Sequence, residues 1–327
     1  MERILTGLQP TGSITLGNYI GAIKQMVAYQ DEYDSYIFIA DMHAITVPQD
    51  PNELSKNIRE LLAIYLACGV DPKKNVIFLQ SENIYHANVS WVLECLTPYG
   101  LLGRMTQFKD KSQKHQNFSA VLLTYPVLMA SDILLYDTDY VPVGKDQKQH
   151  VELARDLAES VNKKYNTNIF KLPNPLIPKD GAKIMDLVDP TKKMSKSAEN
   201  KKGTILLLDD EKDIRKKIMS ATTDSEMIVR YDEENKPGIS NLITIYSALS
   251  GLTIEEVEDK FKDSNYGTFK SEVANIVIET LKPIQERFNN LINSDELDKI
   301  LDDGKKKTME IAEKKYNELK QIVGIHR

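Results

Sequence analysis

The 327-residue chain carries 42 Lys and Arg against 48 Asp and Glu, so its formal net charge is -6 and its pI lies near 5.6. This acidic balance argues against a protein that coats nucleic acid, although a local basic patch remains compatible with it. No run of about 20 uncharged apolar residues occurs, so we expect no membrane span. The first residues, MERILTGLQP, lack the long apolar segment of a signal peptide, and we therefore expect a cytoplasmic location.

The first part of the chain alternates strand and helix patterns. In order, the patterns predict a strand at 3–8, a loop at 9–18, a helix at 19–30, a strand that begins in 35–46, a helix at 51–69 and a strand at 75–81. The second and third strands are continuous apolar runs, which are typical of buried parallel strands. Strand–helix–strand repetition predicts an open parallel sheet with helices on both faces.

The pattern changes after Asn88. The segments WVLECLTPYGLLGRM and TYPVLMASDILLY predict helices, and the polar stretch 108–119 between them predicts a loop. A strand at 139–144 and a helix at 149–165 follow, and only helical patterns occur from about residue 210 onwards. The sequence therefore predicts an α/β N-terminal half followed by an all-helical C-terminal part, which agrees with about two domains at roughly 150 residues each.

The two cysteines, Cys68 and Cys95, lie in the apolar helical patterns IYLACGV and WVLECL. This setting favours two buried thiols in a reducing compartment. No spacing of Cys and His is typical of a zinc site, so the sequence predicts no bound metal.

The loop QPTGSITLGN lies between a strand and a helix, at the edge where an open parallel sheet binds ligands. Gly12 and Gly17 would let the backbone approach a ligand closely, and Thr15 and Asn18 offer polar side chains. The N-terminus of the following helix suits a phosphate group. A simple turn with Asn18 as the helix N-cap explains the same residues equally well.

The segment DPTKKMSKSAEN, at 189–200, concentrates positive charge in an acidic chain. Lys193 and Lys196 flank small hydroxyl residues and could converge on a polyphosphate, where charge-assisted hydrogen bonds are worth about 1.5–3 kcal/mol each. The alternative interpretation is a solvated basic turn.

Two further segments place polar groups near predicted strands or in apolar helices. In VGKDQKQH, Asp146 could accept hydrogen bonds from sugar hydroxyls and Gln147 could both donate and accept, although a helix N-cap explains both residues equally well. Asp132 is the only charge in the apolar run VLMASDILLY, so its carboxylate needs a donor. Met129 lies on the same helix face, and together they suit a ring that carries an N–H. The alternatives are an Asp132 paired to a buried Arg or Lys, or pointing into solvent.

Together these segments resemble a known family. TLGN in the first loop is similar to the HIGH signature of class I aminoacyl-tRNA synthetases, and KMSKS at 193–197 is identical to their second signature. The runs LQPTGSITLGNYIGA, HAIT, RMTQFKDKS, LLTYPVLMASDILLY, VGKDQKQH, DPTKKMSKS and KPGISNLI resemble the bacterial tryptophanyl-tRNA synthetases over nearly the whole chain. The resemblance implies that ATP drives the joining of L-tryptophan to tRNA(Trp), with Mg²⁺ carried by the ATP.

The resemblance also implies a domain plan and an assembly. We expect a Rossmann-type catalytic domain at 1–190, with a helical insertion around 84–137 that forms the interface of a homodimer. Residues 191–327 would contain the KMSKS loop and an all-helical anticodon-binding domain, with the last helix able to pack back on the catalytic domain.

The resemblance assigns ATP binding to residues in four segments. These are Gln9, Pro10 and Thr11; Gly17 and Asn18; Gly144, Lys145 and Asp146 at the ribose, with Ile184 at the adenine; and Lys193, Met194, Ser195, Lys196 and Ser197 at the pyrophosphate. It assigns catalytic roles to Lys193, Lys196, Lys111, Asn18 and Thr15, which stands in place of the first HIGH histidine. Lys145 departs from the family, because some relatives carry an acid there.

The resemblance assigns a tryptophan pocket to a second set of residues. Asp132 would accept the indole N–H, Met129 and His43 would line the ring, Tyr125 and Gln147 would contact the ammonium, and Leu5 and Gly7 would complete the wall. Leu5 departs from the Phe of many relatives, so one aromatic contact is missing.

Two other functions compete with this interpretation. A tyrosyl-tRNA synthetase shares the fold and both signature loops, but its pocket must satisfy a phenol, and MASDILLY and DQKQH favour tryptophan. A non-catalytic paralogue that senses RNA or amino acid usually loses one phosphate loop, whereas both are intact here.

The final helix contains Lys305, Lys306, Lys307, Lys314, Lys315 and Lys320, with three glutamates among them. These lysines predict either a solvated face with ion pairs along the helix or a surface that contacts tRNA phosphates.

Overall fold

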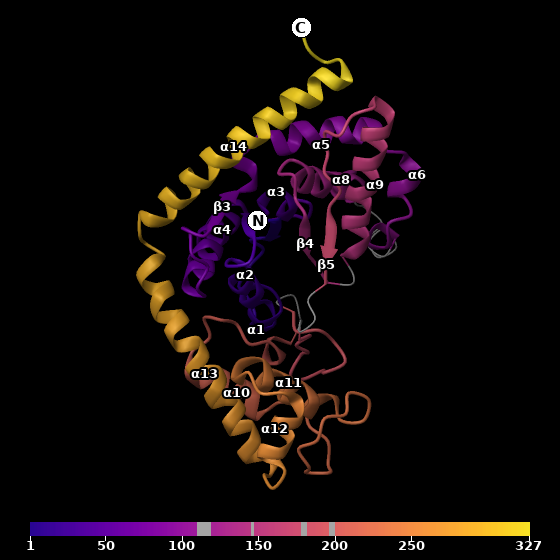
Figure 1. Cartoon of the computed structure of the whole chain (residues 1–327). Coiled ribbons are helices and arrows are strands. Elements are labelled where there is room, and N and C mark those ends of the chain that lie inside the picture. The colour runs from indigo at the N-terminus through magenta and orange to yellow at the C-terminus, as the bar shows by residue number, and fades with distance from the viewer. Residues whose placement is uncertain (110–118, 145–146, 178–181, 196–199) are drawn as a thin grey trace.

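A five-stranded parallel sheet forms the centre of the N-terminal half in the computed structural model, which describes residues 1–109, 119–144, 147–177, 182–195 and 200–327 (Figure 1). The strand order is β3-β2-β1-β4-β5, and every neighbouring pair is parallel. The strands are β1 (Arg3–Leu8), β2 (Asp34–Ile39), β3 (Asn75–Leu79), β4 (Tyr140–Pro142) and β5 (Asn174–Leu176). The prediction of a parallel α/β sheet followed by helices is therefore confirmed.

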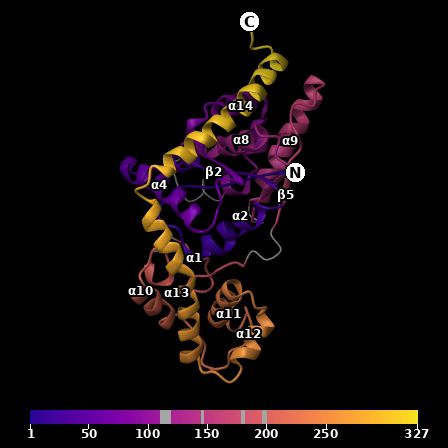
Figure 2. The same cartoon turned by 60° about the vertical axis from the view of Figure 1, so that its left-hand side comes forward.

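Helices flank the sheet and then form the C-terminal part without strands (Figure 2). In the N-terminal half they are α1 (Leu16–Asn18), the π-turn η1 (Tyr19–Ile23), α2 (Lys24–Tyr29), α3 (Asp41–Ala44), α4 (Pro51–Ala67), the 3-10 turn η2 (Gln80–Glu82), α5 (Tyr85–Leu96), α6 (Tyr99–Leu102), α8 (Val121–Leu134) and α9 (Lys148–Tyr165). The 3-10 turn η3 (Lys201–Gly203) then precedes α10 (Glu211–Met219), α11 (Pro237–Ser250), α12 (Ile254–Phe261), α13 (Tyr266–Leu291) and α14 (Glu296–Val323). Among the described residues, no helix is both long and apolar enough to cross a membrane.

Local sequence signals explain where α4 begins and ends. The Asp50 carboxylate accepts the backbone N–H groups of Asn52 and Glu53, and Pro51 occupies the first helical position, where it loses no hydrogen bond. Gly69 follows the last turn at a φ of 104°, a conformation that glycine adopts without steric cost. The chain thereby leaves the helix and enters β3.

Two expectations from the sequence were incomplete or wrong. Strand β5 was not predicted, because Pro175 lies within it; β5 is an edge strand, where proline is tolerated. Cys95 is exposed on α5 and Cys68 is only partly buried, so the expectation of two buried thiols is wrong. An apolar helical pattern shows that a helix has a buried face, but a single residue at its margin can still face solvent.

Each face of the sheet is covered by its own hydrophobic cluster. One cluster contains Ile37 and Leu62 beside the sheet and extends without a break to Leu242 and Phe269 in the C-terminal helices. The other contains Phe78 and Val127 and extends to the last helix. The C-terminal helices therefore share a hydrophobic core with the sheet domain and are not a separate domain joined only by a linker.

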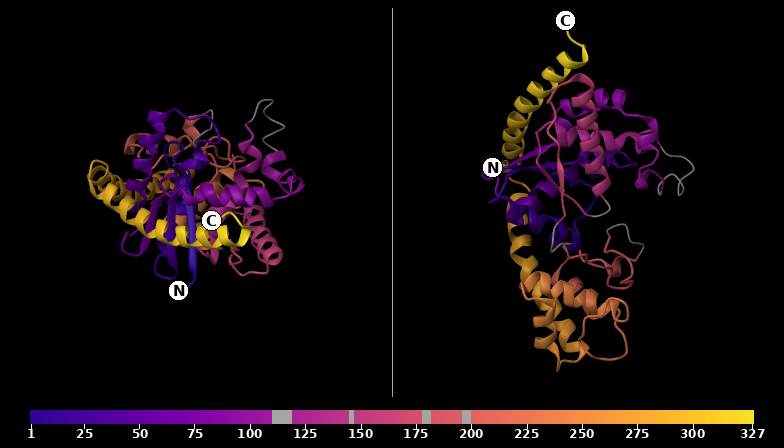
Figure 3. Two further views of the ribbon diagram at one scale, coloured as in Figure 1. Left: turned by 90° about the horizontal axis from the view of Figure 1, so that it is seen from above. Right: turned by 45° about the vertical axis from the view of Figure 1, so that its right-hand side comes forward.

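The last helix, α14, runs back along the N-terminal half of the molecule (Figure 3). It packs against β3, which is an edge strand, and against α5. Its buried positions are three, four or seven residues apart, which places them on one face: Leu297, Gly304, Thr308, Ala312, Lys315 and Leu319. Coverage by α14 leaves no free edge at β3 for pairing with another chain.

Candidate active site

A cleft of about 1100 Å³ opens at the carboxyl ends of β1 and β4. This is the edge at which parallel sheets bind ligands, and the volume is ample for an amino acid and a nucleotide together. Of the residues assigned to ATP or tryptophan from the sequence, those that line the cleft are Leu5, Gly7, Gln9, Gly17, Asn18, His43, Tyr125, Met129, Asp132, Gly144, Gln147 and Lys193.

The remaining assigned residues fall into two groups. Pro10, Thr11, Thr15, Ile184, Met194 and Ser195 are not in the lining of this cleft. Lys111, Lys145, Asp146, Lys196 and Ser197 lie outside the described residues. The structure therefore brings all seven residues of the assigned tryptophan pocket together in one place, and only part of the assigned ATP site.

The first loop is held by a reciprocal cap. The Asn18 backbone N–H donates to Thr15 Oγ1 at 3.1 Å, while Asn18 Oδ1 accepts from the backbone N–H of Thr15 at 3.1 Å and from its hydroxyl at 3.0 Å. Thr15, and not Asn18, is thus the N-cap of the helical segment, and it is 1% exposed. The Thr15 hydroxyl is consequently committed to the cap and faces away from solvent, while Asn18 also lines the cleft.

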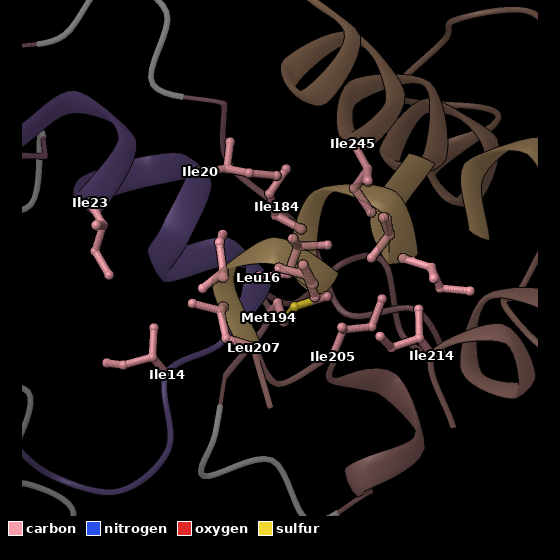
Figure 4. Packing of buried hydrophobic residues seen from close by; sticks show 14 of the residues in the cluster. Ile14, Leu16, Ile20, Ile23, Ile184, Met194, Ile205, Leu207, Ile214 and Ile245 are labelled. Carbon is pink, nitrogen blue, oxygen red and sulfur yellow. The ribbon is translucent and has the colours of Figure 1, made fainter. Parts of the chain in front are cut away.

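Apolar packing joins the first loop to the lysine-rich loop. Leu16, Ile184 and Met194 belong to one buried cluster, shown in Figure 4. Backbone hydrogen bonds reinforce it, from Met194 N–H to Ile184 O (3.0 Å) and from Leu16 N–H to Ile205 O (2.9 Å). Because side chains of both loops pack in one core, the backbone at Lys193 has a defined position relative to Gly17.

The lysine loop itself is shaped by short polar contacts. Asp186 Oδ1 accepts the backbone N–H groups of Val188 and Asp189, and the Asp189 carboxylate pairs with Lys192 Nζ at 2.9 Å. Lys193 points to the cleft instead, and no carboxylate of the described residues pairs with its ammonium group. A loop that neutralises one lysine and leaves the next facing a cleft is suited to an anion.

Asp132 lies at the inner end of the cleft and is 1% exposed. Its Oδ1 accepts from His86 Nδ1 (2.7 Å) and Gln80 Nε2 (2.9 Å), and its Oδ2 accepts from His43 Nε2 (2.8 Å) and Gln80 Nε2 (3.0 Å). Burial raises the pKa of this carboxyl, but the hydrogen bonds from His43 and His86 outweigh burial and lower the pKa to about 2. Asp132 is therefore ionised at neutral pH.

The partners of Asp132 were not found from the sequence. Neither a buried Arg or Lys nor solvent satisfies the carboxylate; two histidines and an amide do so. His86 is itself fixed from behind, because Tyr136 Oη contacts its Nε2 at 2.8 Å and in turn accepts from Asn83 Nδ2 at 3.0 Å. For His86 the sequence offers only a lone histidine in SENIYHAN, and an isolated histidine in an apolar helix does not indicate which residue it will contact.

The polar end of the pocket is formed by Tyr125 and its neighbours. Tyr125 Oη contacts His150 Nε2 at 3.0 Å and donates to Gln107 Oε1 at 3.2 Å. Burial raises the pKa of Tyr125 to about 12, so its hydroxyl is neutral at pH 7. The Tyr125 ring meets the His43 ring edge to face, with the centroids 6.5 Å apart, so these two side chains border the same space.

Comparisons with known proteins identify the family of the chain. The family model of class I tRNA synthetases for tryptophan and tyrosine (W and Y) matches residues 1–282. The tryptophan--tRNA ligase of Bacillus subtilis is 56% identical over 326 residues, which span 100% of this chain and 98% of that protein. The crystal structure of tryptophanyl-tRNA synthetase from Mycoplasma pneumoniae is 37% identical, with a TM-score of 0.91 over 99% of this chain and 98% of that one.

A further solved structure carries ligands. Tryptophanyl-tRNA synthetase from Campylobacter jejuni, complexed with ADP and tryptophan, is 39% identical, with a TM-score of 0.84 over 98% of this chain and 99% of that one. The fold, the two signature loops and these matches define a class I aminoacyl-tRNA synthetase. The chain belongs to the tryptophanyl-tRNA synthetase family within that class.

Proposed function

We propose that this protein activates L-tryptophan with ATP and transfers the tryptophanyl group to tRNA(Trp). In the first step the tryptophan carboxylate attacks the α-phosphorus of ATP, tryptophanyl-adenylate forms and pyrophosphate leaves. In the second step a terminal ribose hydroxyl of the tRNA takes the acyl group. The observation that carries the proposal is the buried Asp132 carboxylate, which lies beside the apolar side chains of Leu5, Met129 and Ile133 in the cleft lining. It is an acceptor placed for a ring N–H.

In this proposal the tryptophan side chain occupies the inner end of the cleft. The indole lies beside Met129 and His43, and its N–H is read by Asp132. The ammonium group is directed to Tyr125 and Gln147, whose polar atoms border the same cleft. A site that hydrogen-bonds a ring N–H rejects rings without one, because its buried acceptor would then stay unpaired.

ATP, which brings Mg²⁺ with it, occupies the outer end of the cleft. Gln9, Gly17, Asn18 and Gly144 border this space, and Lys193 supplies a cation for the leaving pyrophosphate. The ADP bound in the Campylobacter jejuni relative supports a nucleotide site of this kind. No side chain needs to form a covalent intermediate, so catalysis consists of positioning and of stabilising negative charge. Lys111, Lys196 and Thr15 keep the catalytic roles that the resemblance assigns, with Thr15 acting through the cap that shapes the first loop.

The same proposal covers domains, location and assembly. Residues 1–190 form the catalytic domain, residues 191–327 carry the KMSKS loop and the anticodon-binding helices, and the enzyme works in the cytoplasm as a homodimer. Exposed apolar side chains at α5 and α6 support the dimer, because Ile84, at the N-cap of α5, Trp91 and Tyr99 are 57%, 67% and 75% exposed. Sedimentation should give a dimer for the wild type and a monomer for Trp91→Glu, whereas Ile325→Glu, at an exposed site near the C-terminus, should stay dimeric.

ATP–pyrophosphate exchange with each of the twenty amino acids tests the proposed activity. We expect exchange that depends strongly on tryptophan. Comparable exchange with tyrosine would contradict the assignment of the amino acid, and no exchange with any amino acid would contradict the assignment of the reaction.

A further inference from the structure

The Asp132 carboxylate has no acceptor position left for an incoming donor. A carboxylate offers about four lone-pair sites, and three donor nitrogens make four contacts to Asp132, two on each oxygen, with Gln80 Nε2 shared between the two oxygens. An indole N–H can therefore reach this carboxylate only if one of the present donors gives up its place. The structure shows which donor can do so.

Two of the three donors are enclosed by the protein. His86 and Gln80 are both 0% exposed, and neither lines the cleft. His86 is held through its second ring nitrogen by Tyr136, which is also buried. Moving either donor away would leave a buried polar group unpaired, and the unmade hydrogen bonds would disfavour the movement.

His43 differs from these two donors in each respect. It lines the cleft, and its side chain is 9% exposed. Among the described residues, its ring makes one hydrogen bond, from Nε2 to Asp132 Oδ2. It belongs to α3, a helix of four residues, which ties it less tightly than the longer helix that carries His86. His43 can therefore rotate toward the open space of the cleft without breaking any other hydrogen bond of its ring.

We propose that His43 takes the place of the substrate's N–H donor in the empty enzyme. Its Nε2–H donates to Asp132 Oδ2 until tryptophan binds; His43 then turns away and the indole N–H donates to this oxygen instead. This inference rests on the proposed function, because it concerns how the same pocket reads tryptophan. His86 and Gln80 keep their bonds throughout and hold the carboxylate in place. The exchange replaces one N–H donor by another, so the buried charge is never left without a full set of donors.

The exchange gives His43 a role in specificity. A ring without an N–H cannot take over the position at Oδ2, so it must either leave that oxygen unpaired or fit beside a His43 that has not moved. Both outcomes disfavour it. The His43 donor also weakens tryptophan binding, because the hydrogen bond from indole to Asp132 only replaces the hydrogen bond from His43 that already existed. Removal of the His43 donor should therefore tighten tryptophan binding. Removal of a side chain that only contacts the indole ring should instead weaken it.

Two measurements on the full-length enzyme test the exchange. With histidine labelled by ¹⁵N in the ring, tryptophan should shift the ring signals of His43 and leave those of His86 in place; the chain has five histidines, and His43→Phe assigns the signal. The benzothiophene analogue of tryptophan, which has sulfur in place of the N–H, should leave the His43 signals at their positions in the empty enzyme. An unmoved His43 signal at saturating tryptophan would overturn the inference.

The second measurement is equilibrium binding of tryptophan to His43→Phe, which keeps an aromatic wall and removes the donor. We expect roughly five- to tenfold tighter binding than in the wild type, which corresponds to the net worth of one hydrogen bond. Equal or weaker binding would overturn the inference. The proposed function is judged separately, by tryptophan-dependent pyrophosphate exchange in the wild type, so failure of the exchange at Asp132 cannot be confused with failure of the activity.

Discussion

The helix α14 approaches the sheet closely at Gly304, and this contact gives a sharp test of how the two halves of the chain are joined. A methyl group at this position would lie 1.7 Å from the carbonyl oxygen of Ile77 and 2.6 Å from its carbonyl carbon, whereas ordinary contact begins at about 3.4 Å. The obstacle is backbone of β3, so no side-chain rotation can relieve it. Helix and strand would have to separate by more than 1 Å.

The expected cost of Gly304→Ala follows from two opposing terms. Alanine is favoured over glycine by about 1 kcal/mol in a helix interior. Overpacking of a close contact typically costs about 1–3 kcal/mol, and a contact between two backbones belongs at the upper end of that range. We therefore expect a net loss of about 2 kcal/mol in the free energy of unfolding.

Urea unfolding followed by circular dichroism measures this loss. With a slope of about 2–3 kcal/mol per molar urea, the midpoint for Gly304→Ala should fall by about 0.7–1 M. Gly100 in α6 is the matched control, because a methyl group there meets nothing within 4 Å, and Gly100→Ala should leave the midpoint unchanged or slightly higher. A Gly304→Ala midpoint at or above that of the wild type would refute the close approach of α14 to β3.

Three further outcomes follow from particular contacts. Lys193→Ala should slow single-turnover adenylate formation by roughly 10²–10³-fold with little effect on tryptophan binding; a higher KM for ATP at an unchanged rate would instead show that Lys193 binds only the ground state. Lys315 is buried and its Nζ contacts a carboxylate at 2.6 Å and a backbone carbonyl at 2.8 Å, so Lys315→Met should lose about 1–3 kcal/mol of stability, while Lys314→Met, at the exposed neighbouring position, should lose none. Partial burial raises the pKa of Cys68 to about 12, so at pH 8 iodoacetamide should modify this thiol far faster in urea than in the native protein, and equal rates would contradict the shielding of this thiol in the fold.

The class of fold and the family could be predicted from the sequence because their signals are local. A continuous apolar run such as SYIFIA indicates a buried parallel strand, and β2 is buried along nearly its whole length. The signatures TLGN and KMSKS are contiguous, so they can be found without knowledge of the fold. Asp132 could also be singled out, because a lone charge in an apolar run is visible in the sequence.

The partners of these residues were decided by the tertiary structure. His43 and Gln80 lie 89 and 52 positions from Asp132, and His86 lies 46 positions away, so no window of sequence contains the cluster. The same holds for Lys315, one of seven lysines in the last helix. It alone among them is buried, because Asp137 and the carbonyl of Ile169 meet it across the fold. A local pattern records which face of a helix is apolar, whereas a hydrogen-bond partner from a distant element exists only once packing brings the two elements together.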